Sequence, residues 1–209
     1  MRKKTAIFLT IFYVAITLAD IVVTRVGTPD LGDEANPLVQ LLLRLTGSYV
    51  VAWIGLILSN LLVMAVYLVP LWYSMVYYRR PAPFEADGFR DYLKKLDKEK
   101  GEFRVFVAML GFAMGFSLPI ARIVPVLEWL TIFATGGLPY AYNRVRNAFP
   151  MGRPDICLAA LLLLVLAMVW YRMEFTANRR AWAALTKAEQ ADEEQETPEE
   201  EAVGDGAAQ

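Results

Sequence analysis

The sequence predicts an all-α, polytopic helical membrane protein with four transmembrane helices and a short interfacial or re-entrant helix. Hydrophobic residues make up 56% of the 209 residues, which exceeds the share usual for soluble domains. Apolar runs of about 20 residues or more, the length that crosses a bilayer, recur along the chain. Lys and Arg flank these runs and acidic residues gather near the C-terminus, so the net charge of -1 conceals a strong asymmetry.

The first span covers about residues 5–26 and follows a basic start. A cleaved signal peptide is the alternative, because Thr17-Leu18-Ala19 is a suitable small-residue cleavage site. The apolar run continues to Val26, however, and so reaches the length of a spanning helix. Its polar residues share one helix face through spacings of 4, 3 and 4 residues: Tyr13, Thr17, Asp20 and Thr24.

Asp20 places a carboxylate inside this span. A carboxylate at the bilayer centre costs roughly 2.5 to 3.5 kcal/mol on insertion scales, so Asp20 should face the bundle or a wet cavity and have a partner. We expect Arg122, in the third apolar tract, to be that partner, with hydrogen bonds to Thr24 or Asn60. Helix packing through hydrogen bonds and a functional site both explain such a polar face.

A short apolar helix is predicted from Pro37 to Thr46. Asn36 suits the N-cap, Pro37 suits the first helical position and Gly47 suits the end. At about 15 Å this helix cannot cross about 30 Å of hydrocarbon, so it should lie in the interface or re-enter the bundle. Glu34 lies near its positive end, as a dipole partner or as a ligand.

The second span covers about residues 49–78, with aromatic belts at both ends and Arg79-Arg80 behind it. Pro70 should kink it. One face repeats every seven residues and can meet the Asp20 face: Trp53, Asn60, Tyr67 and Ser74. The following linker, residues 79–101, is expected to be a cytoplasmic, solvated connector with a weakly amphipathic helix carrying Phe89, Tyr92, Leu93 and Leu96.

The third span covers about residues 103–138, which is long for a single crossing. Its interior contains Pro119, Arg122, Pro125 and Glu128, so it is either one broken helix or a hairpin of two short spans. We favour the single helix, and the hairpin would make five spans. Gly111 and Gly115 form a small face that permits close helix approach, within the chain or in self-association.

The fourth span covers about residues 154–173 and has hardly any polar side chains, so it should be a lipid-facing wall. These spans and the linker make up a membrane domain at residues 1–180. Residues 181–209 are acidic and poor in apolar residues, which predicts a largely disordered tail.

The composition excludes several function classes. The chain has no histidine and one cysteine, Cys157, which removes the usual zinc sites and histidine-assisted nucleophiles. No phosphate-binding loop, nucleophile elbow or dinucleotide fingerprint is present. Nucleic acid is not an expected partner, because basic residues are not interleaved with exposed aromatic residues. No cofactor is evident, and the sequence leans away from an enzyme.

The residues around the first loop resemble a known family. Asp20-x-x-x-Thr24, then Gly27 or Gly32, then Glu34-Ala35-Asn36-Pro37 and a Leu-rich helix resemble a family of small prokaryotic membrane proteins known as a domain of unknown function. The resemblance covers about residues 5–125. It implies a membrane-embedded helical fold and no particular activity.

Three function classes follow from these features. The first is a membrane accessory or interaction protein with a buried polar cluster, the second a small transporter or cation-binding protein, and the third an intramembrane lipid-modifying enzyme using paired carboxylates. The residues we expect to form the polar cluster or a ligand site are Asp20, Thr24, Glu34, Asn36, Asn60, Arg122 and Glu128.

The expected location is the cell (cytoplasmic) membrane, with multiple crossings. Basic residues flank the first span, the second span and the end of the fourth, which predicts that both termini and the linker are cytoplasmic. The expected partners are the lipid bilayer and either another protein or a second copy that associates through Gly111 and Gly115.

Overall fold

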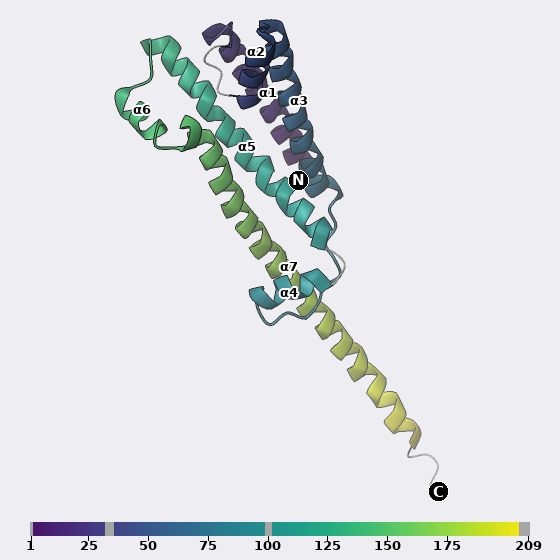
Figure 1. The fold of residues 1–209 in the computed structure, drawn as a ribbon. Coiled ribbons are helices and arrows are strands. Elements are labelled where there is room, and N and C mark those ends of the chain that lie inside the picture. Colours follow the sequence, from purple (N-terminus) through teal and green to yellow (C-terminus); the bar gives the residue numbers. More distant parts are fainter. Residues whose placement is uncertain (1, 32–35, 99–101, 205–209) are drawn as a thin grey trace. The chain divides into compact units, whose positions relative to one another are not determined.

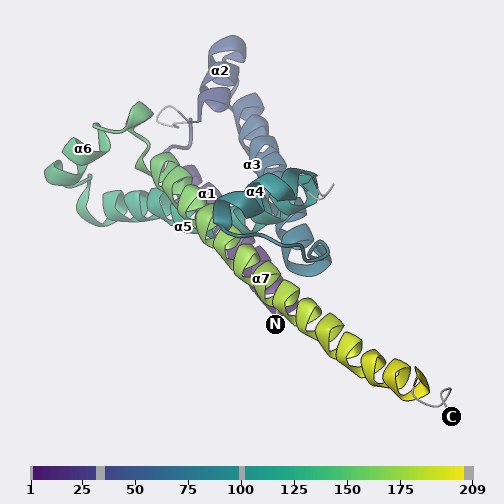
Figure 2. The same cartoon turned by 90° about the horizontal axis from the view of Figure 1, so that it is seen from below.

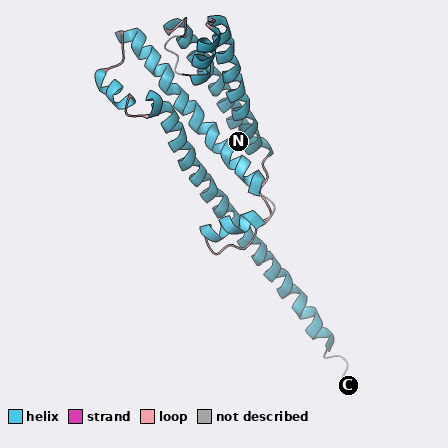
Figure 3. Ribbon diagram, viewed as in Figure 1, coloured by secondary structure: helices cyan, strands magenta, loops and turns pink. Residues whose placement is uncertain are grey.

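The computed structural model describes residues 2–31, 36–98 and 102–204, and within these ranges the chain is helical, without strands (Figure 3). The long helices are α1 (Arg2–Gly27), α3 (Tyr49–Trp72), α5 (Glu102–Thr135) and α7 (Pro154–Gly204). All four are long and apolar enough to cross a membrane. The shorter helices are α2 (Pro37–Thr46), α4 (Phe89–Lys98) and α6 (Tyr140–Arg146). The predicted all-α, polytopic membrane fold is therefore confirmed.

The chain forms two compact units. The first contains Met1–Tyr78 and Arg104–Trp170, and the second contains Arg79–Phe103 and Tyr171–Gln209. This division differs from the predicted membrane domain at residues 1–180, because the linker and the middle of α7 associate in a unit of their own.

In the first unit, α2 has the ends that its sequence predicts. The Asn36 side chain accepts a hydrogen bond from the Leu38 amide at 3.0 Å. At the other end, Gly47 adopts a left-handed conformation (φ 62°) and donates its amide to the Leu43 carbonyl, which is a common helix stop. Leu31, Val39, Ala52 and Leu56 form a buried apolar cluster between this helix, the loop before it and α3.

α1, α3 and α5 pack together in the first unit (Figures 1 and 2), and side chains of their predicted polar faces are in contact. The rings of Tyr13 and Tyr67 stack with their centroids 3.9 Å apart. The Tyr67 hydroxyl lies 3.3 Å from two backbone carbonyl oxygens, those of Leu9 on α1 and Gly115 on α5. The face of α3 that repeats every seven residues therefore contacts α1 and α5 at Tyr67.

The third tract is one continuous helix, α5, and the hairpin alternative is wrong. Both Pro119 and Pro125 lie inside it, and membrane helices tolerate proline where neighbouring groups compensate for the lost backbone bond. A Cβ atom at Gly111 would overlap the Pro70 carbonyl oxygen, and one at Gly115 would lie 2.8 Å from Leu71 Cδ1. The close approach that these glycines permit is therefore made within the chain, whereas self-association through them would need that face free.

Pro70 lies inside α3 and is followed by a π-helical turn at Tyr73–Tyr77. The irregularity predicted for this proline is thus a locally widened helix, and the second span still extends to Tyr77. Wide turns of this kind are a recognised response to strain within a helix.

α7 has few contacts along its most apolar stretch. Only 6% of that stretch is buried, against 50% in α5, which agrees with the predicted lipid-facing wall. Beyond Arg180, α7 continues as helix to Gly204, where composition favours a largely disordered tail. Ala, Glu, Lys and Gln are good helix formers, and extending an existing helix avoids the cost of a new nucleus.

The second unit is more than a solvated connector. Tyr92 is buried, and its ring lies beside those of Phe84 and Phe175 at centroid distances of 5.4 and 5.6 Å. Arg80 pairs with Glu174 through contacts of 3.0 and 3.1 Å. The linker is therefore packed on the middle of α7, because the apolar face of α4 has a partner there.

Candidate functional site

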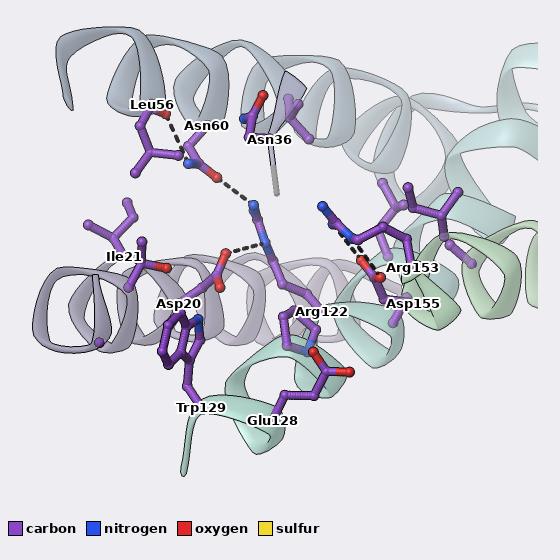
Figure 4. A pocket seen from close by; sticks show the side chains of 18 of the residues that line it. Asp20, Ile21, Asn36, Leu56, Asn60, Arg122, Glu128, Trp129, Arg153 and Asp155 are labelled. Carbon is purple, nitrogen blue, oxygen red and sulfur yellow. Dashed lines mark hydrogen bonds and ion pairs between the residues drawn. The ribbon is translucent and has the colours of Figure 1, made fainter. Parts of the chain in front are cut away.

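Arg122 is the centre of a polar cluster that joins three helices. Its Nε lies 3.4 Å from Asp20 Oδ2. One Nη1 bond runs to Thr17 Oγ1 at 3.0 Å, and a longer one runs to the Tyr13 hydroxyl at 3.4 Å. Its Nη2 donates to Asn60 Oδ1 on α3 (Figure 4). We call these five residues the Arg122 cluster.

The cluster replaces water around the guanidinium. The side chains of Arg122 and Asp20 are 20% and 19% exposed, so each retains only a small solvent-accessible part. Arg122 also lies over the Tyr13 ring at 5.7 Å from its centroid, a cation–π geometry. Asn60 is held in turn by its own amide, which donates to the Leu56 carbonyl at 2.9 Å. The predicted Asp20–Arg122 pair is confirmed, with Thr17 and Asn60 as hydrogen-bond partners of Arg122 rather than Thr24.

The cluster borders a cavity of about 950 Å³ in the first unit. The cavity extends from the middle of α1, α3 and α5 to the ends of α1 and α5 and the start of α7, and its wall includes Thr24, Glu128 and Asp155. Figure 4 shows the polar side chains from different helices around this space. A cavity of this size is at the upper end of the range that holds small ligands.

A second ion pair borders the cavity at its loop side. Arg146 Nε lies 3.6 Å from Glu128 Oε1 and donates a hydrogen bond to the Gly152 carbonyl at 3.0 Å. The Tyr142 hydroxyl donates to Glu128 Oε1 at 2.6 Å. Burial, followed by the hydrogen bond to Glu128, raises the pKa of Tyr142 to about 12. Tyr142 is therefore a stable hydrogen-bond donor to Glu128 at neutral pH.

A third ion pair lies at the start of α7. Arg153 forms a two-pronged contact with Asp155, at 2.9 Å from Nε to Oδ1 and 2.7 Å from Nη2 to Oδ2. Both residues line the cavity (Figure 4). Paired contacts of this shape are among the stronger interactions of arginine with carboxylates.

The structure brings most of the predicted site residues to this one cavity. The exception is Glu34, which lies outside the described residues. Asn36 also donates from its amide to Ser59 Oγ at 3.4 Å, in addition to capping α2. The six predicted residues that line the cavity are Asp20, Thr24, Asn36, Asn60, Arg122 and Glu128.

Sequence reasoning missed the loop side of the site. Tyr142, Arg146, Arg153 and Asp155 are not among the site residues that the sequence predicts. A detectable signal was the group of three arginines and one aspartate within residues 144–155, directly before the fourth span. Their meeting with Arg122 depends on helix packing that no local pattern encodes.

The arrangement offers no cluster for a metal ion among the described residues. No group of three or more Asp, Glu, Cys or His side chains is placed to hold one in residues 2–31, 36–98 and 102–192. The wall of the cavity instead contains both arginines and carboxylates. Such a wall suits ligands that carry hydrogen-bonding groups or both signs of charge.

No protein-family model, curated protein or solved structure matches the chain. The resemblance carried by Asp20, Thr24 and the Glu34 to Pro37 segment therefore stays a prediction.

Proposed function

We propose that this chain is a multi-pass protein of the cell membrane that acts as an accessory or interaction protein, with the Arg122 cluster as the polar joint of its bundle. The observation that supports this proposal is the set of side-chain contacts that the guanidinium of Arg122 makes. Each nitrogen of its guanidinium engages a side chain of α1 or α3. A cation engaged in this way suits a structural anchor between helices.

A small binding or transport protein is the second candidate, and the cavity of about 950 Å³ favours it. A hard cation is a poor fit, because Arg122, Arg146 and Arg153 all line the space and such ions need several free oxygen ligands. The enzyme alternative, with Asp20 and Glu128 as paired carboxylates, has less support because an arginine holds each of them.

The accessory role predicts that the chain occurs in a complex in its own membrane. The test is to tag the chain at its native level, extract it in mild detergent, and measure the mass of the particle by size exclusion with light scattering. We expect a mass well above one chain plus its micelle. A particle containing one chain only would contradict the accessory role.

The proposed topology places the amino terminus, the linker and the tail in the cytoplasm. Four crossings put both termini on one side, and Arg79, Arg80 and Arg172 supply the positive flanks. Replacing Cys157, the sole cysteine, with Ser gives a background for labelling. A cysteine at Ala141 should then react with an impermeant reagent outside intact cells, and one at Ala191 should not. Labelling at Ala191 would reverse the proposed orientation of the tail.

A further inference from the structure

The cavity wall combines a charged part with an apolar part. Among the described residues that line it, three are arginines and three are carboxylates, so their formal charges cancel. The apolar part includes Ile21, Leu56, Val63, Leu118, Trp129 and Ile132. A ligand of a single sign would meet repulsion from half of the charged groups, whereas a zwitterion can place each end against its opposite.

Several hydrogen-bonding groups of this wall are still available. The closest ion-pair contact of Arg146 and its hydrogen bond both use Nε, and its Nη groups donate no hydrogen bond within the described part of the chain. Asp20 meets Arg122 through Oδ2, and Glu128 receives Tyr142 and Arg146 at Oε1. The other oxygen of each carboxylate accepts no hydrogen bond from the described residues. A fork of donors and two acceptors thus remain beside one cavity.

The position of the cavity indicates a ligand from the bilayer. It extends from Tyr13, Asn60 and Leu118, near the middle of α1, α3 and α5, to the ends of α1 and α5 and the start of α7, and all four helices are candidate spans. Span ends are the depth at which lipid head groups lie. The volume of about 950 Å³ exceeds what a head group alone fills, so the apolar wall has room for the first part of an acyl chain.

We propose that this cavity binds a zwitterionic phospholipid with a primary ammonium group, of the phosphatidylethanolamine type. Its phosphate is held by the free Nη fork of Arg146, a geometry that arginine uses widely for phosphate. Its ammonium donates to the open oxygens of Asp20 and Glu128. A trimethylammonium head has no N–H to donate, and a neutral glycerol head has no positive charge, so both fit less well.

Binding is measured on the purified full chain in detergent, by native mass spectrometry and by the rise in melting temperature on adding lipid. The probes share their acyl chains and differ in the head: phosphatidylethanolamine, phosphatidylcholine and phosphatidylglycerol, together with chain-free glycerophosphoethanolamine. We expect phosphatidylethanolamine to bind most tightly. Tighter or equal binding of phosphatidylglycerol would overturn the proposal. Equal binding of the chain-free compound would overturn its lipid part.

Variants test the named contacts. Arg146→Gln should weaken phosphatidylethanolamine binding by about tenfold, the order expected for one charge-assisted contact. Arg144→Gln is the matched control, because Arg144 is on the same helix, exposed, and outside the cavity wall. Glu128→Gln keeps an acceptor for Tyr142 but should reduce the preference for phosphatidylethanolamine over phosphatidylcholine. Unchanged binding by Arg146→Gln would overturn the assignment.

Folding defects do not confuse this test. The melting temperature of each variant without added lipid reports its fold, and Arg146→Lys retains the charge while losing the fork. If Arg146→Gln fails to fold, the order of lipids on the unaltered chain decides the proposal. The inference goes beyond the accessory role, and a single-chain particle in the mass measurement would leave the lipid result standing.

Discussion

The two compact units each contain an arginine–carboxylate pair that joins distant parts of the sequence, and the surroundings of the two pairs differ. In the first unit, Asp20 and Arg122 are both about one-fifth exposed and share a cavity with Asn60. In the second unit, the Nε of Arg80 donates to both carboxylate oxygens of Glu174, and the side chains of Arg80 and Glu174 are 45% and 6% exposed.

The difference shows how environment sets the number of partners that an arginine needs. Water reaches Arg80, so a single carboxylate is enough as its protein partner. Nearby, Asn178 accepts a hydrogen bond from the Phe84 amide at 3.1 Å and donates one to the Phe84 carbonyl at 2.8 Å. Among membrane spans, protein groups must replace that water. Thr17, Tyr13 and Asn60 do so for Arg122. Breaking an arginine–carboxylate pair should therefore lower the free energy of unfolding more in the first unit than in the second.

The largest expected effect comes from separating the pair in the first unit. Asp20→Asn should lower the free energy of unfolding by roughly 3 to 5 kcal/mol, because it leaves the guanidinium buried without its countercharge. Adding Arg122→Gln should restore part of that loss. The measurement is a double-mutant cycle on detergent-purified protein. Simple additivity of the two substitutions would mean that the pair contributes no coupling.

A smaller effect is expected from the packing of α5 on α3. Gly111→Ala should cost about 1 to 3 kcal/mol, since the added methyl group meets the Pro70 backbone, which cannot move aside like a side chain. Gly137→Ala is the control, because a Cβ there meets nothing within 4 Å. Thermal unfolding of both variants measures the difference. Equal melting temperatures would show that α5 does not approach α3 so closely.

The pair in the second unit should matter less than that in the first. Glu174→Gln keeps the shape of the side chain and leaves Arg80 in reach of water, so we expect a loss of roughly 1.5 kcal/mol, at the low end for hydrogen bonds to charged groups. Hydrogen exchange in residues 84–96 is the local readout. Glu189→Gln, an exposed change on α7, is the control. A loss as large as that of Asp20→Asn would remove the contrast between the units.

The smallest effect concerns alkaline pH in the second unit. Burial, and then the charge of Glu174, raises the pKa of Tyr92 from 10.0 to about 12. Because the unfolded chain loses this proton first, the stabilising contribution is complete below about pH 10 and is lost as pH rises through about 12. Tyr92→Phe should flatten this part of the pH profile of exchange in α4. Tyr140→Phe, at a largely exposed tyrosine, should leave it unchanged.

Local features of this protein follow directly from its sequence. The spans are set by hydrophobic length, and the ends of α2 by Asn36, Pro37 and Gly47, each acting within a few residues. The cost of a carboxylate in a membrane was also sufficient to predict that Asp20 has a partner, and the supply of cations inside the spans pointed to Arg122.

Tertiary structure decided what these features do together. The local signal of Pro119 and Pro125 allowed one helix or two, and the structure has a single helix that continues through both prolines. The sequence predicts a solvated linker helix, whereas in the structure Tyr92 of α4 contacts Phe175 of α7. Arg146, Arg153 and Asp155 meet Asp20 around one cavity only because helices distant in sequence pack there. Contacts over such separations depend on the shape and packing of whole helices, which a local pattern does not contain.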